Sequence, residues 1–212
     1  MDIATANAAA TELDAEGIIR YACEYGPAPA LVSTNFRPGE AVILHLLTRV
    51  QPDIPVLWVD HGYNTSETYR CAEQLIERLQ LNVQLFTPRR TRAHREALQP
   101  ELPEPDTPAH DALTEELKLE PFRRGLRSLR PGTWFTALRR EQTAFRAALQ
   151  AFATDATGLV DYPLVKVCPL LDWDEARMQA YLREHDLPDE TIYFDPTKVH
   201  GSRECGLHPG KG

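Results

Sequence analysis

The sequence predicts an α/β fold, in which a mostly parallel, twisted sheet carries helices on both faces. Three apolar segments typical of buried strands, 29–36, 53–60 and 81–88, alternate with two helical segments within about 60 residues. Right-handed crossovers between such strands place the helices against the sheet. With 212 residues the chain is long enough to bury a core, and no repeat or linker divides residues 1–212. We therefore expect a single domain.

The elements of this unit are supported in order along the chain. Residues 11–25 carry apolar side chains at helical spacing. A Pro-Gly pair marks the start of a helix over 38–50, and DIPVLWVD after it is nearly all apolar, as in parallel strands. In the next helical segment Ser66 is a candidate N-cap, and apolar residues recur up to Leu79.

The second half of the chain continues the alternation less regularly. Residues 89–120 run basic, then proline-rich and acidic, which indicates a loop or lid with a short helix, and we assign them no chemistry. A strand over 132–136 is expected to pass into a polar and then helical stretch. A further strand over 162–173 and an amphipathic helix over 174–187 follow. The last 24 residues have no periodic pattern.

Composition and charge limit the function classes. The net charge of −8 argues against a protein that binds nucleic acid or an anionic membrane. No signal peptide and no membrane span are expected, and four scattered cysteines, Cys23, Cys71, Cys168 and Cys205, suit neither a disulfide framework nor a zinc or iron–sulfur site. The sequence predicts a cytoplasmic protein with reduced thiols.

Two polar loops follow neighbouring strands of the predicted sheet. In STNFRPGEA, Ser33 and Thr34 offer hydroxyls before a helix start that can receive an anion. In VDHGYNTSETY, Asp60 can orient a ribose hydroxyl or a base amine, and Gly62 permits close approach of a ligand. The alternative for each loop is an ordinary strand-to-helix turn, which in the second loop Asp60 would cap. Ligands in such sheets bind at the carboxyl ends of the strands.

Arginines concentrate in one part of an otherwise acidic chain. Between Pro121 and Arg146 there are seven arginines and one acid, Glu141. On a helix, Arg139 and Arg146 would share a face, and guanidinium groups suit bidentate recognition of phosphate or sulfate. The alternatives are an anion site and a solvated helix face.

A single cysteine lies in the terminal stretch SRECGLHPGKG. A nucleophilic Cys205 must be an exposed thiolate near positive groups. Arg203 and His208 are close in sequence, although Glu204 opposes them. An inert tail cysteine is the alternative. The other three cysteines occupy apolar helix or strand patterns, which predicts core positions.

Taken together, STNF, VDHGYNTSETY, WFTALRREQTAFR, VCPLLDWDEARMQAYL and RECGLH resemble, in this order, the phosphoadenylyl-sulfate (PAPS) reductase family of sulfate assimilation. The resemblance runs from about Leu31 to His208. It implies an adenine nucleotide α hydrolase-like (PP-loop type) Rossmann-like fold with a flexible C-terminal tail. It also implies reduction of PAPS to sulfite and adenosine 3′,5′-bisphosphate, through an S-sulfocysteine on Cys205 that thioredoxin or glutaredoxin then reduces.

The resemblance also implies a set of site residues. Cys205 is the expected nucleophile, carried on a mobile catalytic tail over 195–212. The expected substrate-binding residues are Ser33, Thr34, Phe36, Asp60, Gly62, Arg139, Arg140, Arg146 and His208. No bound cofactor and no iron–sulfur cluster are expected, because the CC and CxxC pairs of related adenylyl-sulfate (APS) reductases are missing. A cytoplasmic homodimer without nucleic-acid or membrane partners is expected, working in cysteine biosynthesis.

The sequence departs from the family pattern at two places, which keeps other functions open. Arg37 stands where a small residue is more common, and either adds a phosphate contact or caps the loop. The segment DETIYFDPTKVHGS is short compared with relatives. The alternatives are APS as substrate, a non-catalytic nucleotide-binding homologue, and an ATP pyrophosphatase of the same fold. The last needs an SGGxDS-type loop, whose glycines and aspartate STNFRPG lacks.

Overall fold

A six-stranded sheet forms the centre of the protein. The computed structural model describes residues 1–189 and 192–198. The strands are β1 (Ala30–Thr34), β2 (Pro55–Val59), β3 (Asn82–Phe86), β4 (Thr133–Phe135), β5 (Phe152–Thr154) and β6 (Val165–Val167). Their order across the sheet is β3-β2-β1-β4-β6-β5. All neighbouring pairs are parallel except β5 with β6. The predicted α/β class with a mostly parallel sheet is confirmed, and the antiparallel edge strand β5 was not predicted.

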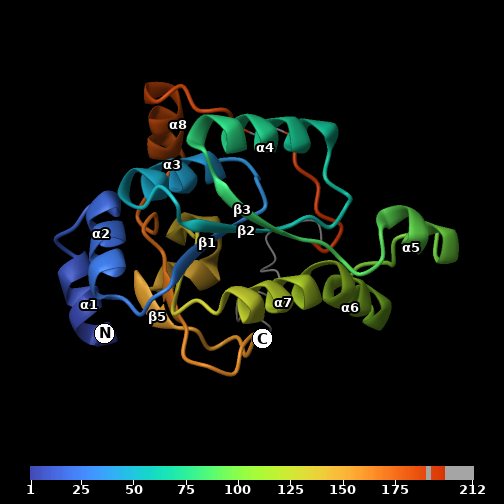
Figure 1. Cartoon of the computed structure of the whole chain (residues 1–212), viewed down its shortest axis with the longest axis horizontal. Helices are drawn as coiled ribbons and strands as arrows, with labels where there is room; N and C mark the ends of the chain where they lie inside the picture. The colour runs from blue at the N-terminus through green and yellow to red at the C-terminus, as the bar shows by residue number, and fades with distance from the viewer. Residues whose placement is uncertain (190–191, 199–212) are drawn as a thin grey trace.

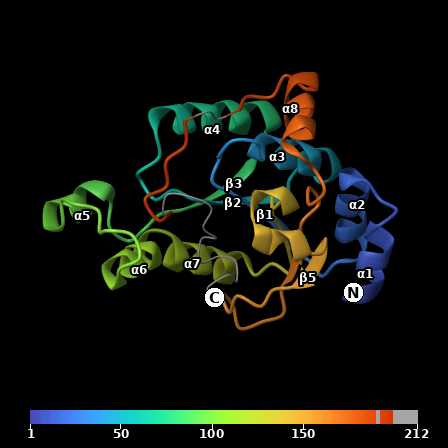
Figure 2. The same ribbon diagram turned by 180° about the vertical axis from the view of Figure 1, so that it is seen from behind.

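Helices cover both faces of the sheet. The α-helices are α1 (Ile3–Ala10), α2 (Ala15–Tyr25), α3 (Glu40–Val50), α4 (Ser66–Leu79), α5 (Arg92–Leu98), α6 (Pro108–Thr114), α7 (Glu120–Leu129) and α8 (Glu175–Glu184). Helices α3, α4 and α8 lie on one side of the sheet, and α6 and α7 lie on the other (Figures 1 and 2). The amino-terminal helices α1 and α2 pack beside α3 and the β5 edge.

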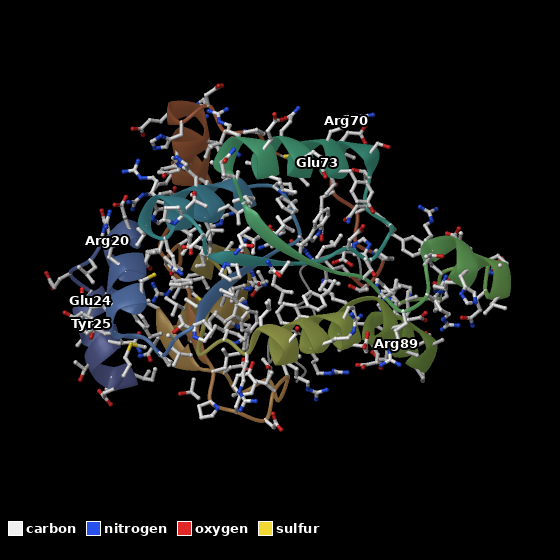
Figure 3. All side chains as sticks on the ribbon, viewed as in Figure 1. Arg20, Glu24, Tyr25, Arg70, Glu73 and Arg89 are labelled. Carbon is white, nitrogen blue, oxygen red and sulfur yellow. The ribbon has the colours of Figure 1, made fainter. Side chains whose placement is uncertain are left out.

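Two apolar clusters hold these layers together. The larger joins the inner sides of α2, α3, α4 and α8 to one face of the sheet, with Val32, Ile43 and Phe135 completely buried. The smaller packs Phe122 and Leu126 of α7 against the opposite face. Charged side chains such as Arg20, Arg70 and Arg89 point outwards (Figure 3). This alternation of buried and exposed positions is the pattern from which the helices were predicted.

Local details differ from expectation at three places. The N-cap of α4 is Thr65, whose Oγ1 accepts the N–H of Thr68, so the predicted cap Ser66 is one residue late. Residues 89–120 contain α5, α6 and a π-helix, η1 (Glu115–Leu119), where one short helix was expected. After β4 the expected helical stretch consists of two 3₁₀ turns, η2 (Arg140–Gln142) and η3 (Ala144–Ala148).

Within the part of the chain that the structure describes, no helix is both long and apolar enough to cross a membrane.

The carboxyl ends of β1, β2 and β4 open onto a cavity that is lined by polar side chains from several segments. The fold therefore places its polar residues where parallel sheets usually bind ligands.

Candidate active site

A cavity of about 660 Å³ lies at the carboxyl ends of β1, β2 and β4. Its wall includes Trp134 from β4, Phe122 from α7 and residues from the loops after β1 and β2. Residues 193–196 and Lys198 line it as well. This size suits a mononucleotide-sized ligand rather than a single ion.

The loop after β1 is braced by its own glutamate. Thr34 Oγ1 donates to Glu40 Oε2 at 2.6 Å and accepts the Phe36 N–H at 3.0 Å. The Asn35 N–H donates to the same Glu40 oxygen at 2.9 Å. Ser33 Oγ accepts from the Trp134 indole N–H at 2.8 Å. Ser33 and Thr34, the predicted anion contacts of this loop, both line the cavity, but the Thr34 hydroxyl and the Asn35 N–H already hold the protein's own carboxylate.

Phe36 holds this loop in place by packing into the core and does not face the cavity. Its side chain is 1% exposed and its ring packs edge-on against Trp58, with ring centroids 4.9 Å apart. Its backbone has φ of +52°, a left-handed conformation that a bulky residue adopts only when its surroundings hold it there. The structure thus places Phe36 in the core and not among the cavity-lining residues.

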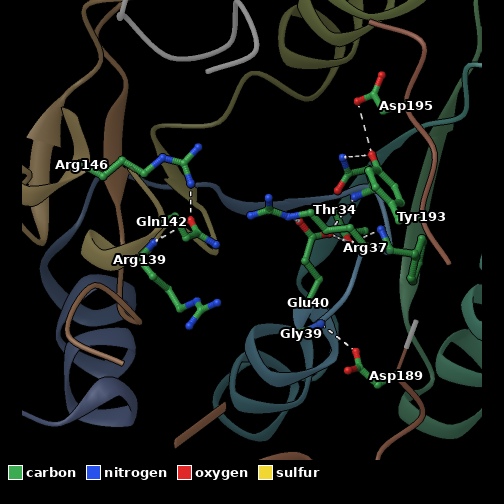
Figure 4. A network of polar contacts seen from close by, with 12 residues as sticks. Thr34, Arg37, Gly39, Glu40, Arg139, Gln142, Arg146, Asp189, Tyr193 and Asp195 are labelled. Carbon is green, nitrogen blue, oxygen red and sulfur yellow. Dashed lines mark hydrogen bonds and ion pairs between the residues drawn. The ribbon is translucent and has the colours of Figure 1, made fainter. Parts of the chain in front are cut away.

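Arg37 reaches the cavity from the same loop. Its Nε donates to Glu40 Oε1 at 3.0 Å, and its side chain lines the cavity wall. Arg146 lies across the open space from the loop that carries Thr34 and Arg37 (Figure 4). Two guanidinium groups on facing walls form a suitable clamp for an anionic group of a ligand.

Of the three arginines predicted to contact an anion, the structure brings only Arg146 to the cavity. Arg139 pairs with Glu141 and, at 2.7 Å, with Glu175, and Arg140 pairs with Asp172 and the Leu149 carbonyl. The expectation that Arg139 and Arg146 share a helix face is wrong, because 3₁₀ turns replace the helix and Arg139 is extended.

The loop after β2 is organised around Asp60. Its Oδ1 accepts from the Gly62 N–H at 2.9 Å, the Asn64 amide at 3.0 Å and the Tyr69 hydroxyl at 2.8 Å. Burial and this hydrogen bond raise the pKa of Tyr69 to about 12. Gly62 has φ of +78°, which glycine adopts without strain. Asp60 and Gly62 shape the loop, while His61 between them lines the cavity.

His61 is 4% exposed, and its Nδ1 accepts the Tyr63 N–H at 3.0 Å. Burial lowers its pKa, and the nearby Lys118 ammonium acts in the same direction, whereas Asp195 and Asp60 oppose the shift. The imidazole is therefore neutral at pH 7. His61 was not predicted as a site residue, because nothing in its spacing separates a cavity-lining histidine from a loop residue.

A buried ion pair lies in the cavity wall near His61. Lys118 Nζ of the π-helix η1 lies 2.6 Å from Asp195 Oδ2, and the two side chains are 8% and 1% exposed. Burial alone would raise the pKa of Asp195, but the Lys118 ammonium and hydrogen bonds from Lys118 and Thr197 hold it well below its usual range. Lys118 lies in residues 89–120, to which no chemistry was assigned, and Asp195 begins the predicted catalytic tail over 195–212 without having been predicted as a site residue.

Residues 192–198 run along the cavity and are tied to three other segments. Thr65 Oγ1 donates to the Ile192 carbonyl at 2.9 Å, and the Asn35 amide hydrogen-bonds the Tyr193 hydroxyl at 2.6 Å. The His110 ring contacts the Pro196 carbonyl at 3.2 Å, beside the Lys118–Asp195 pair.

The predicted nucleophile Cys205 and the predicted contact His208 lie outside the described residues. Cys71 and Cys168 are buried, as predicted, whereas Cys23 is half-buried and packs against the edge of the core. Burial raises the pKa of the Cys168 thiol, whose sulfur lies 3.1 Å from the Thr136 hydroxyl. In residues 1–189 and 192–198, no three His, Cys, Asp or Glu side chains gather in a way that could hold a metal.

The Arg146 geometry leads to a first prediction. We expect Arg146→Gln to weaken binding of adenosine 3′,5′-bisphosphate, the nucleotide that the sequence resemblance implies, about tenfold, because a charge-assisted hydrogen bond in the cavity is lost. Isothermal titration calorimetry measures the change. Arg127→Gln removes the same charge from an exposed site on α7 and should leave binding within about twofold. Equal losses in both variants would contradict a local contact at Arg146.

Comparison with known proteins shows where this architecture recurs. The family model described as "Phosphoadenosine phosphosulfate reductase domain" matches residues 29–205. A protein named phosphoadenosine 5′-phosphosulfate reductase from Xylella fastidiosa is 38% identical, over 99% of this chain and 86% of its own length. One of the same name from Serratia proteamaculans is 34% identical, over 99% of this chain and 93% of its own length.

Solved structures agree on the fold. The phosphoadenylyl-sulfate reductase of Candida auris, solved as a phosphate complex, superposes with a TM-score of 0.76 at 21% identity, covering 89% of this chain and 87% of its own. FMN adenylyltransferase of Candida glabrata superposes with a TM-score of 0.53 at 14% identity, covering 84% of this chain and 61% of its own. Two reactions on one scaffold show that the fold alone does not decide the chemistry.

Proposed function

The chain belongs to the phosphoadenosine phosphosulfate reductase family, and we propose that it reduces PAPS to sulfite and adenosine 3′,5′-bisphosphate in assimilatory sulfate reduction. The observation that carries this proposal is the cavity at the carboxyl ends of β1, β2 and β4, with Arg37 and Arg146 on facing walls. An anionic nucleotide fits this arrangement, because guanidinium groups meet its charged end and aromatic walls from Phe122 and Trp134 meet its nucleoside.

In the first half-reaction the Cys205 thiolate attacks the sulfur of the sulfuryl group. The new bond joins the cysteine sulfur to the substrate sulfur, and the bond from that sulfur to the phosphate oxygen breaks. Adenosine 3′,5′-bisphosphate leaves with the bonding electrons. Arg146 and Arg37 stabilise the negative charge that develops on this leaving group.

In the second half-reaction a dithiol protein of the thioredoxin or glutaredoxin class supplies two electrons. Its thiolate attacks the Cys205 sulfur of the S-sulfocysteine, sulfite departs, and a mixed disulfide forms. The second thiol of the partner resolves this disulfide and returns Cys205 to its reduced state. We place the reaction in the cytoplasm, where such dithiols are kept reduced, and propose a homodimer without a bound cofactor.

Residues 1–212 act in this proposal as one domain whose stretch 195–212 carries the nucleophile. Cys205 follows Lys198 by seven residues, and a chain of that length spans at most about 25 Å. Lys198 itself lines the cavity. Seven residues of chain are therefore long enough for the thiol to reach a bound nucleotide in one half-reaction and a protein partner in the next.

Mass spectrometry of the intact protein tests the chemistry directly. After mixing with PAPS and no reductant, we expect one sulfonate adduct per chain, which peptide mapping assigns to Cys205. An unmodified Cys205, or an adduct on Cys23, would overturn the proposed mechanism. A parallel reaction with APS measures specificity: faster adduct formation with APS would reverse the assigned substrate.

A further inference from the structure

One donor in the cavity wall has no partner among residues 1–189 and 192–198. The His61 Nδ1 accepts the Tyr63 N–H, so the neutral ring carries its hydrogen on Nε2. The Nε2 atom is buried and makes no hydrogen bond to any described residue. Among the described residues that line the cavity, no other has a buried side-chain nitrogen or oxygen left without a partner. Buried donors are nearly always satisfied in native structures, so this one calls for an acceptor that the described residues do not supply, such as a ligand in the cavity.

The Asp195 carboxylate, whose charge acts on His61, already accepts hydrogen bonds from other residues. Asp195 Oδ2 accepts from Lys118 Nζ at 2.6 Å and from the Tyr193 hydroxyl at 3.3 Å. Asp195 Oδ1 accepts from the Thr197 N–H at 2.9 Å and from the Thr197 hydroxyl at 2.6 Å. With both carboxylate oxygens used, Asp195 balances the Lys118 charge and leaves no favourable acceptor for His61.

The surroundings of His61 select a neutral acceptor. On this side of the cavity the charges of Lys118 and Asp195 compensate each other, and Val59 and Phe122 supply apolar wall. The guanidinium groups of Arg37 and Arg146, which suit the anionic end of a nucleotide, belong to the β1 loop and to η3. A nucleotide whose charged groups meet those arginines leaves its neutral nucleoside for the rest of the cavity wall, which includes His61.

We infer that His61 is a specificity-determining residue, whose Nε2–H donates to a neutral acceptor of the nucleoside, either a base ring nitrogen or a ribose oxygen. This inference rests on the proposed function. It explains why His61 keeps its Nδ1 engaged with the Tyr63 N–H: that bond fixes the tautomer and directs the remaining hydrogen.

Two substitutions separate this donor from the support that His61 gives to its loop. His61→Asn places an amide oxygen near the Nδ1 position, so it can still accept the Tyr63 N–H while nothing replaces Nε2. His61→Gln places an amide N–H near the Nε2 position and gives up the Tyr63 contact. Calorimetry with adenosine 3′,5′-bisphosphate, which binds without turnover, compares them with the unchanged chain.

We expect His61→Asn to weaken binding about tenfold with an unchanged Tm, and His61→Gln to recover part of the loss. Binding of His61→Asn within about twofold of the unchanged chain would overturn the inference and leave the proposed function standing. No binding by the unchanged chain at millimolar nucleotide would overturn the proposed function and the inference with it.

Ligand analogues identify the acceptor and guard against a purely structural effect. The 1-deaza, 3-deaza and 7-deaza base analogues and the 2′-deoxy analogue each remove one neutral acceptor. The analogue that lacks the partner of His61 should bind the unchanged chain about tenfold more weakly, yet bind His61→Asn no worse than the parent nucleotide does. If no analogue shows this coupling, in either His61→Asn or His61→Gln, the inference is wrong.

Discussion

Cys205→Ser is expected to lower the rate of sulfite release by at least about a thousandfold, because a serine hydroxyl is not ionised at neutral pH and attacks sulfur poorly. The affinity for adenosine 3′,5′-bisphosphate should stay within about twofold, since the cavity is built from residues 33–198. Coupled assays with PAPS and a reduced dithiol protein measure the rate, and calorimetry measures the affinity.

Cys23→Ser is the matched control for this loss. Cys23 lies half-buried on α2, its sulfur 3.6 Å from the Gln51 side chain, and burial raises the pKa of its thiol. This variant should keep its turnover. If Cys205→Ser retains turnover, or if both variants lose it together, the tail thiol is not the nucleophile.

Lys118→Met should lower the free energy of unfolding by about 3–5 kcal/mol, because it leaves the Asp195 carboxylate buried without its counter-ion. Urea denaturation at pH 7 measures the loss. The double variant Lys118→Met/Asp195→Asn removes both charges and keeps an acceptor for the Thr197 N–H, so it should recover at least half of it.

Arg70→Met provides the surface comparison. Arg70 and Glu67 form an ion pair whose side chains are 69% and 50% exposed, and breaking such a pair costs at most about 1 kcal/mol. A loss in Lys118→Met no larger than in Arg70→Met would show that the buried pair does not stabilise the fold.

The regular part of the fold could be predicted because its signals are local. The three parallel strands before residue 89 and the helices between them show apolar runs and helical stripes that burial on the sheet explains. The comparisons confirm the adenine nucleotide α hydrolase-like fold that the motifs implied. The helix α7 was not predicted, because its buried stripe, Phe122 and Leu126, is short and stands among three arginines.

The candidate site was harder to predict, because its members are distant in sequence. Lys118 lies in a π-helix, whose wider turn changes which side chains face inwards. A pattern search with the α-helical period of 3.6 residues therefore cannot predict that Lys118 is buried. Asp195 lies in a segment with no periodicity at all. The arginine run predicted Arg139 and Arg140 as anion contacts, but acids from other elements pair with both.

The bracing of the first loop by Glu40 has a consequence for how the cavity responds to its medium. In many nucleotide-binding folds, rigid main-chain dipoles at a helix start hold the phosphate. Here an internal carboxylate competes for the Thr34 hydroxyl and the Asn35 N–H, so an incoming anion depends on the long side chains of Arg37 and Arg146. Capture then costs rotamer entropy and is screened by dissolved ions, so ionic strength becomes a means of tuning how long the product stays bound.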